Sequence, residues 1–383
     1  MVELPYGSVP YPVHLGSRTA SILELPRPPA PPPLAGLLDV ALAHPLGRPS
    51  LDRLVAPGTR ITVVVSDATR DEPRSGFLAA LRRALPLARW TIAIATGTHG
   101  PSALEPLGID DELRRAARVV NHDGHDESEL VTLGTTTRGT PVRVHRCIVD
   151  TDLVIATGCI RPHYFAGFGA GAKAVFPGLG QAHAIRVNHR WKTDPRAIAG
   201  SVDDNPCRLD LEEAVAMLPA PVFLLNGVCG NDGAVHAAIA GDPVVAFREG
   251  ARLARDWFVV RAPRAPLVIA SDALPITASL YQAAKIASAV APLVEPGGTL
   301  LLVAECAEGV EPLETVNEAI FRIGVLPRLA DGVSIQLVSS LSTSVVERTL
   351  VHSAASIGDV LARVPGVILI VPHASHLIVE VTS

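Results

Sequence analysis

Short apolar runs alternate with longer amphipathic stretches from residue 61 onward. The apolar runs are rich in β-branched side chains and are bounded by glycine or polar residues, which is typical of buried parallel strands. We expect strands at 61–65, 91–95, 119–120 and 153–157, a hairpin at 130–136 and 140–148, and helices at 75–85, 102–114 and 243–257. This alternation predicts a mostly parallel sheet with helices on both faces.

The N-terminal segment has a different pattern. Residues 2–15 contain two short apolar runs around a turn at Tyr6-Gly7-Ser8 and predict a pair of strands, whereas residues 18–24 have helix-like spacing. Residues 26–33 are mostly proline, which excludes a helix and favours an extended connector on the surface.

A second α/β pattern begins after the proline-interrupted segment 261–266. We expect its strands at 267–270, 299–304, 334–338 and 366–371, and its helices at 279–290, 316–323, 345–349 and 357–364. The predicted fold class is therefore α/β, with two domains and mostly parallel sheets. We place the first domain at residues 1–258 and the second at 262–374, with residues 375–383 returning to the first domain.

Composition narrows the class of protein. Hydrophobic residues make up 48% of the 383 and charged residues 19%, which fits globular packing, and the net charge of −5 gives no electrostatic reason to expect nucleic acid. No run approaches the roughly 18 apolar residues that span a bilayer, and the first residues lack a basic, apolar leader. The five cysteines show no zinc spacing and suit buried thiols in a reducing compartment. We expect a cytoplasmic protein that acts on small molecules.

Reactive side chains follow three of the predicted strands. Asp67 and Arg70 come just after the first strand, and the second strand runs directly into His99. The third ends near Gly158, and the glycine- and alanine-rich segment after it carries His163 and Lys173. Small residues let the backbone approach a ligand, and ligands of open α/β sheets collect outside the carboxyl ends of the strands. We infer that Arg70, His99 and His163 line one crevice.

Several motifs, in order along the chain, resemble the nickel-pincer-nucleotide-dependent lactate racemase family. They are Asp67-Ala68-Thr69-Arg70, the glycine-rich segment 158–178, Val187-Asn188-His189-Arg190-Trp191 and Tyr281-Gln282-Ala283-Ala284-Lys285. The resemblance implies that Lys173 joins a nickel pyridinium-3,5-bisthiocarboxylic acid mononucleotide covalently and that His189 is the nickel ligand. It places Asp67, Thr69 and Gly171 at the cofactor, makes His99 and His163 the acid–base pair, and assigns the substrate to Arg70, Tyr281, Gln282 and Lys285.

The chemistry implied by the resemblance suits these residue types. Such an enzyme inverts C2 of a 2-hydroxy acid through a 2-oxo acid, by proton-coupled hydride transfer to and from the cofactor. Because no side chain accepts hydride, a cofactor is required, and because either enantiomer can enter, two histidines serve as bases. The substrate, lactate or a related 2-hydroxy acid, is expected in the cleft between the domains. The enzymes that make the pincer cofactor are the expected protein partners.

Two other functions remain open on the residues alone. The first is a metal-dependent hydrolase or lyase in which one zinc or iron ion is bound by His99, His163 and His189. This function gives Lys173 and the small residues around it no role. A non-catalytic carrier would bind the nickel cofactor through Lys173 and His189 without an acid–base pair. The His- and Asp-rich cluster at 121–127 is not assigned as a metal site, because contiguous residues in a loop rarely converge on one ion.

Overall fold

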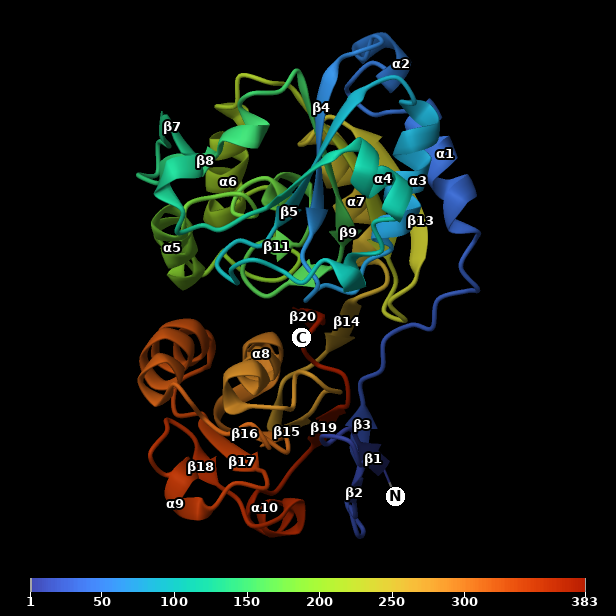
Figure 1. Cartoon of the computed structure of the whole chain (residues 1–383). Coiled ribbons are helices and arrows are strands. Elements are labelled where there is room, and N and C mark those ends of the chain that lie inside the picture. The colour runs from blue at the N-terminus through green and yellow to red at the C-terminus, as the bar shows by residue number, and fades with distance from the viewer. Residues whose placement is uncertain (1, 383) are drawn as a thin grey trace. The chain divides into compact units, whose positions relative to one another are not determined.

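The structure is a computed structural model that describes residues 2–382 (Figure 1). The chain divides into two compact units. The central unit is Arg27–Trp257, and the terminal unit consists of the described residues before Arg27 and after Trp257. The prediction of an α/β fold with two domains and mostly parallel sheets is confirmed.

The central unit is built on a sheet with the strand order β13-β12-β9-β4-β5-β6. These strands are β4 (Arg60–Ser66), β5 (Arg89–Ala95), β6 (Arg118–Asn121), β9 (Leu153–Ile160), β12 (Val222–Cys229) and β13 (Val235–Gly241). Neighbouring strands are parallel except for the β12–β13 pair. Since β4, β5 and β9 run in the same direction, the residues that follow them emerge at one edge of the sheet.

Helices cover both faces of this sheet. They are α1 (Leu34–Ala43), α2 (Leu51–Leu54), α3 (Arg74–Ala84), α4 (Asp111–Ala116), α5 (Ala182–His189), α6 (Pro206–Ala216) and α7 (Val245–Arg255). Leu38 of α1 and Phe77 of α3 share a hydrophobic core with alternate strand residues such as Val63. Figure 1 shows α1 and α3 on one side of the sheet and α5 and α6 on the other. The hairpins β7–β8 (Leu130–Thr135 and Pro141–His145) and β10–β11 (Pro162–His163 and Gly167–Phe168) complete the unit.

The terminal unit has a second sheet, with the order β18-β17-β16-β15-β19-β3 and parallel neighbours. Its strands are β3 (Ala20–Ile22), β15 (Ala265–Ala270), β16 (Val294–Val303), β17 (Ser334–Val338), β18 (His352–Ser353) and β19 (Ile368–Val371). Its helices are α8 (Leu280–Val290), the π-helix η7 (Thr315–Val325), α9 (Thr343–Val346) and α10 (Ile357–Arg363). Val268 packs in one core with α8 and Leu267 in another with α10, so the sheet is buried on both faces.

Two short strand pairs accompany this second sheet. The predicted N-terminal pair is confirmed as antiparallel β1 (Val2–Leu4) and β2 (Tyr11–Val13). Near the other end of the chain, β14 (Val259–Ala262) pairs in parallel with β20 (Ile378–Val381).

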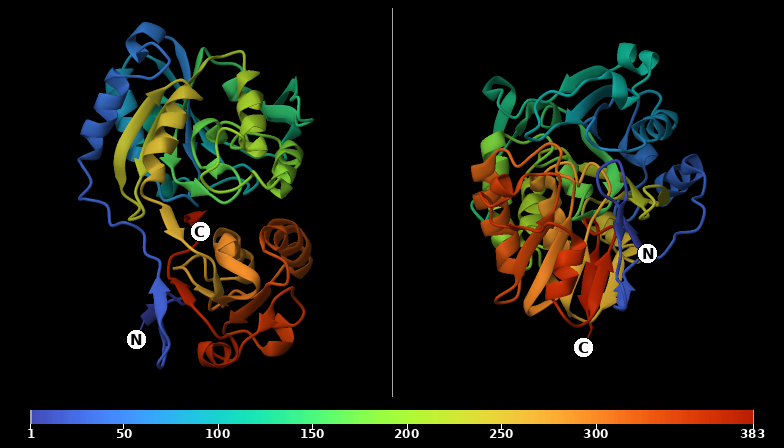
Figure 2. Two further views of the ribbon diagram at one scale, coloured as in Figure 1. Left: turned by 180° about the vertical axis from the view of Figure 1, so that it is seen from behind. Right: turned by 90° about the horizontal axis from the view of Figure 1, so that it is seen from below.

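The helix expected at residues 18–24 is wrong, because Ala20–Ile22 form β3 and pair with β19. Figure 2 shows this N-terminal segment, in blue, beside the red strands of the chain's other end. Backbone pairing with a sheet edge outweighs a weak local helix preference. The pairing also places residues 2–26 in the terminal unit, which corrects the expectation that residues 1–258 form one domain. Residues 375–382 likewise belong to the terminal unit rather than returning to the first domain.

The helix expected at 102–114 is shorter than predicted. A 3-10 turn at Glu105–Leu107 ends at Gly108, whose φ of 65° is left-handed, and α4 begins only after Asp110 caps it. The proline-rich connector has no helix or strand from residue 23 to residue 33, as predicted. Within residues 2–382, none of the helices is long and apolar enough to cross a membrane.

Candidate active site

Asp67 and His99 lie just beyond the carboxyl ends of β4 and β5. Asp67 is buried, and its Oδ2 lies 2.7 Å from Nδ1 of the half-exposed His99. A carboxylate only accepts hydrogen bonds, so Nδ1 of a neutral His99 carries the proton and Nε2 presents a lone pair. Burial raises the pKa of Asp67, but hydrogen bonds from His99 and Thr69 outweigh burial and lower the pKa below its usual value. His99 is thus oriented as a base.

Thr69, which was expected at the cofactor, donates both of its hydrogen bonds to this same carboxylate. Its hydroxyl donates to Asp67 Oδ1 at 2.5 Å, and its backbone N–H donates to the same oxygen at 3.0 Å. Both oxygens of Asp67 therefore have partners within the protein. The geometry favours an orienting role toward His99 for Asp67, which the sequence analysis placed at the cofactor.

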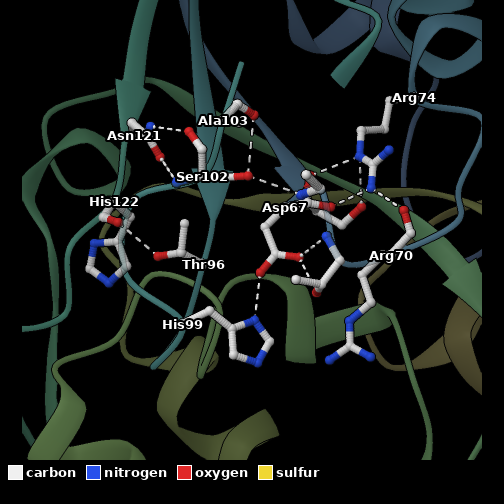
Figure 3. Close-up of polar contacts among 12 residues, drawn as sticks. Asp67, Arg70, Arg74, Thr96, His99, Ser102, Ala103, Asn121 and His122 are labelled. Atoms are coloured by element: carbon white, nitrogen blue, oxygen red, sulfur yellow. Dashed lines mark hydrogen bonds and ion pairs between the residues drawn. The ribbon is translucent and has the colours of Figure 1, made fainter. Parts of the chain in front are cut away.

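The backbone of this loop is held by Arg74, a buried residue that the sequence analysis missed. The Arg74 guanidinium donates to the carbonyl oxygens of Ser66, Asp67 and Arg70. The Arg70 guanidinium extends away from these contacts, on the same side as the His99 ring (Figure 3). The sequence offers no distinguishing signal for Arg74, since an arginine in the first turn of a helix is usually solvent-exposed.

His163 lies in the β10–β11 hairpin that follows β9. Its Nδ1 accepts the backbone N–H of Ala166 at 3.2 Å, so the neutral ring carries its proton on Nε2. Burial lowers the pKa of His163 well below its usual value, and the positive charges of Lys173 and Arg70 lower the pKa further. His163 is therefore a neutral ring that offers a hydrogen-bond donor, whereas His99 offers an acceptor.

Gly171 begins the short 3-10 turn Gly171–Ala174 that carries Lys173. Its φ is 63°, and a Cβ added to it would lie 2.4 Å from the ring of Phe247. Its backbone N–H donates to Asn226 Oδ1 at 2.9 Å. A side chain at this position would be strained in conformation and would clash, so glycine is required to place the lysine.

Lys173 has the electrostatics of a reactive amine. Burial lowers its pKa to about 8, and the charges of Arg70 and Arg208 act in the same direction. Within residues 2–382 no hydrogen bond is found for its Nζ. A primary amine with a lowered pKa and no partner is suited to form a covalent bond with a ligand.

His189 is the last residue of α5. The Phe165 ring packs edge-on against it at 4.9 Å between centroids and against His163 at 4.6 Å, so one aromatic ring contacts both imidazoles. Burial lowers the pKa of His189 to about 3, and the charge of Lys173 contributes. The ring is therefore neutral near pH 7, which is the form that ligates metals.

The segment that carries His163 and Lys173 is held from behind by α6. Arg208 of this helix is fully buried and donates to the carbonyl oxygens of Ala166, Phe168 and Ala170. Its guanidinium also lies 4.1 Å from the centre of the Phe247 ring. No helix was predicted from the sequence at this position, where Asn205-Pro206 is a typical helix start.

The structure thus brings four predicted residues into electrostatic contact within the central unit. Lys173 and Arg70 each lower the pKa of His163, and Lys173 lowers that of His189. The terminal unit carries Tyr281, Gln282 and Lys285, which lie on the first two turns of α8. There Lys285 Nζ donates to Gln282 Oε1 at 2.6 Å, and Tyr281 is exposed.

The alternative of a metal ion held by three histidines finds no support in residues 2–382. No group of three or more His, Cys, Asp or Glu side chains suited to hold a metal ion occurs there, which disfavours the three-histidine site. The described residues 121–127 contain no such group, and His122 among them is fully buried. All five cysteines are free and buried, as predicted.

The chain is similar in sequence and in structure to proteins of known family. Residues 6–200 match the family model of the lactate racemase N-terminal domain, which is more than half of the chain. The chain belongs to the lactate racemase family. The matched span contains every predicted site residue from Asp67 to His189, whereas Arg208 and the three residues of α8 lie beyond it.

Individual relatives of this lactate racemase family extend the similarity. Lactate racemase from Thermoanaerobacterium thermosaccharolyticum is 30% identical over 278 residues, which cover 70% of this chain and 65% of that protein. Lactate racemase from Lactiplantibacillus plantarum is 29% identical over 281 residues, covering 71% and 66%. The matched stretches thus span just under two thirds of these relatives' own length. The structure of the Thermoanaerobacterium lactate racemase apoprotein aligns over 99% of both chains, with a TM-score of 0.85 and 25% identity.

Proposed function

We propose that this protein is a racemase or epimerase that inverts C2 of a 2-hydroxy acid, lactate or a close relative, through a 2-oxo acid. The observation that carries the proposal is the amine of Lys173, whose pKa is lowered to about 8 beside His163, Arg70 and His189. Membership of the lactate racemase family supports the same class of reaction.

The residues present fit a nickel-pincer nucleotide. Lys173 offers a buried amine with a lowered pKa for covalent attachment, and His189 offers a neutral imidazole for the metal. When bound, this cofactor would supply the hydride acceptor and donor that no side chain provides. Enzymes that synthesise the cofactor are then the protein partners we propose, in the cytoplasm.

The two histidines would handle the hydroxyl proton of the substrate. His99 Nε2 has a lone pair because Asp67 holds Nδ1, so His99 removes the proton and Asp67 stabilises the resulting imidazolium. His163 donates from Nε2 to the oxygen bonded to C2, in the tautomer that the backbone of Ala166 selects. For the opposite enantiomer His163 must exchange this tautomer, which costs its contact with Ala166.

Charged side chains would orient the substrate. Arg70 presents a guanidinium fork to the carboxylate, and Lys285, held by Gln282, adds a second positive charge. Tyr281 on the same helix would cover the substrate. We place these residues on the substrate because a carboxylate held between two cations orients C2 toward the hydride acceptor.

The test compares wild type with Lys173→Ala after coexpression with pincer-biosynthesis enzymes. We expect wild type to carry an added mass containing nickel and sulfur by intact-protein mass spectrometry, and to racemise lactate or another 2-hydroxy acid. The variant should lack both the adduct and the activity. Absence of the adduct from both proteins would contradict the cofactor assignment, and an adduct without turnover on any 2-hydroxy acid would favour a carrier.

His99→Gln separates the enzyme from the carrier. In a carrier, this substitution would leave the adduct in place and there would be no turnover to lose. In the proposed enzyme, the variant keeps the adduct but its kcat falls about 10²–10⁴-fold. Equal rates for wild type and variant would exclude His99 from catalysis.

A further inference from the structure

A buried chain of hydrogen bonds runs from α6 to the end of α5. Asn188 and Asp210 are both fully buried, and Asn188 Nδ2 donates to Asp210 Oδ2 at 2.7 Å. The other side of the same amide, Oδ1, lies 3.2 Å from His189 Nδ1. This chain of hydrogen bonds thus ends at His189, the residue that the proposed function assigns to nickel.

Asp210 accepts hydrogen bonds at both of its carboxylate oxygens. The hydroxyl of Thr136 donates to Oδ1 at 2.5 Å, and the hydroxyl of Thr140 donates to Oδ2 at 2.6 Å. The Thr136 hydroxyl oxygen itself accepts the backbone N–H of Thr140, so its proton is directed at the carboxylate. With the amide of Asn188 as a third donor, Asp210 acts as an acceptor at both oxygens.

The orientation of the Asn188 amide is therefore fixed. Its Nδ2 faces two acceptors, Asp210 Oδ2 and the carbonyl oxygen of Cys207 at 3.3 Å. Its Oδ1 faces two donors, the thiol of Cys207 at 3.4 Å and the ring of His189. Reversing the amide would set NH₂ against the Cys207 thiol proton and oxygen against a carboxylate, so one orientation alone satisfies every partner.

The fixed amide determines the tautomer of His189. Oδ1 of Asn188 only accepts, so the proton of the neutral imidazole lies on Nδ1 and Nε2 keeps its lone pair. A neutral imidazole that donates from one nitrogen and ligates through the other is the usual arrangement at metal sites. We propose that Asn188 and Asp210 are positioning residues that hold His189 with Nε2 ready for the metal ion. The inference rests on the proposed function for the identity of that ion.

The experiment measures the tautomer in the apoprotein, without cofactor or activity. Ring ¹⁵N shifts of labelled histidines distinguish protonated from unprotonated nitrogens, and His189→Gln assigns the signal. We expect the Nδ1–H form in wild type and a mixture with substantial Nε2–H in Asn188→Leu, which has nearly the same shape. Thr140→Val is the matched control, because it removes one donor from Asp210 and leaves the contact with Asn188. Its His189 signal should stay that of wild type.

Nickel content per chain, measured after coexpression with the biosynthesis enzymes, gives the second readout. Asn188→Leu should retain about 10–100-fold less nickel than wild type after identical coexpression and purification, and Thr140→Val should match wild type. An Nε2–H form of His189 in the wild-type apoprotein overturns the positioning role, and this result does not depend on the folding of any variant. An unchanged tautomer in folded Asn188→Leu overturns it as well. Nickel absent from wild type overturns the proposed function and the metal-directed role, whatever the tautomer.

Discussion

Asp67 and His99 follow neighbouring parallel strands and meet at Nδ1 of the histidine, 2.7 Å from the carboxylate. Asp67→Asn replaces this acceptor with an amide that can donate to Nδ1, which favours the tautomer with its proton on Nε2. Nε2 of His99 would then carry a proton and could not remove the hydroxyl proton of the substrate. We expect kcat for racemisation to fall about 10²–10⁴-fold, measured as initial rates by chiral chromatography.

Asp152→Asn is the control for that substitution. Asp152 pairs with Arg60 at the opposite end of β4, where both side chains are exposed. An exposed ion pair contributes little to stability, so this variant should keep its activity within about twofold. Equal losses in the two variants would show that Asp67 supports folding rather than the tautomer of His99.

Lysine labelling tests the environment of Lys173. The chain has three lysines, Lys173, Lys192 and Lys285, so each can be followed on its own peptide. Burial lowers the pKa of Lys173 to about 8, and the amine should therefore react with acetic anhydride with a midpoint near pH 8 in the apoprotein. A midpoint near 10.5, the ordinary lysine value, would contradict a buried, deprotonatable amine.

Acid should destabilise the protein through His145. It is buried against His122 and Glu129, with Arg118 and Arg146 nearby, and burial lowers its pKa from 6.5 to about 4. Between these values the unfolded chain binds a proton that the folded chain does not. The stabilisation is complete above about pH 6.5 and is lost as the pH falls toward 4, by at most about 3 kcal/mol from this residue.

Urea unfolding at pH 7.5 and 5.0 measures this effect. His145→Gln should lose less stability than wild type between the two pH values, because the substituted side chain does not titrate. The exposed His125 provides the control, since His125→Gln should keep the wild-type dependence. A wild-type slope in His145→Gln would assign the acid sensitivity to other buried histidines.

Gly171→Ala should disturb the turn that carries Lys173. The new methyl would lie 2.4 Å from the Phe247 ring and would force a side chain into φ near 63°, at a cost of about 1–3 kcal/mol or more. We expect a lower melting temperature and a smaller fraction of chains with the cofactor mass. Gly139→Ala separates the causes, because its φ is 86° but nothing lies within 4 Å of the added carbon. Equal effects in the two variants would leave the clash without a role.

The sequence predicted the positions of the candidate site residues best where they follow the ends of strands. Asp67, Arg70 and His99 follow short β-branched runs, and a parallel sheet brings such ends to one edge. It failed at β3, where pairing with a distant strand overrides local preference. It also missed Arg74 and Arg208, because an arginine that is buried by donating to backbone carbonyls has the same sequence pattern as one on the surface.

The helix α6 has a mechanical consequence for any ligand bound at both Lys173 and His189. Arg208 donates to the backbone of the segment that carries Lys173. Asp210, two residues further along the helix, accepts from the Asn188 amide, which contacts His189. Contacts from one helix therefore hold the segment that carries Lys173 and the amide next to His189. A tilt of α6 would move Lys173 and His189 together. The distance between these two residues would therefore vary less than the distance between residues held by separate loops.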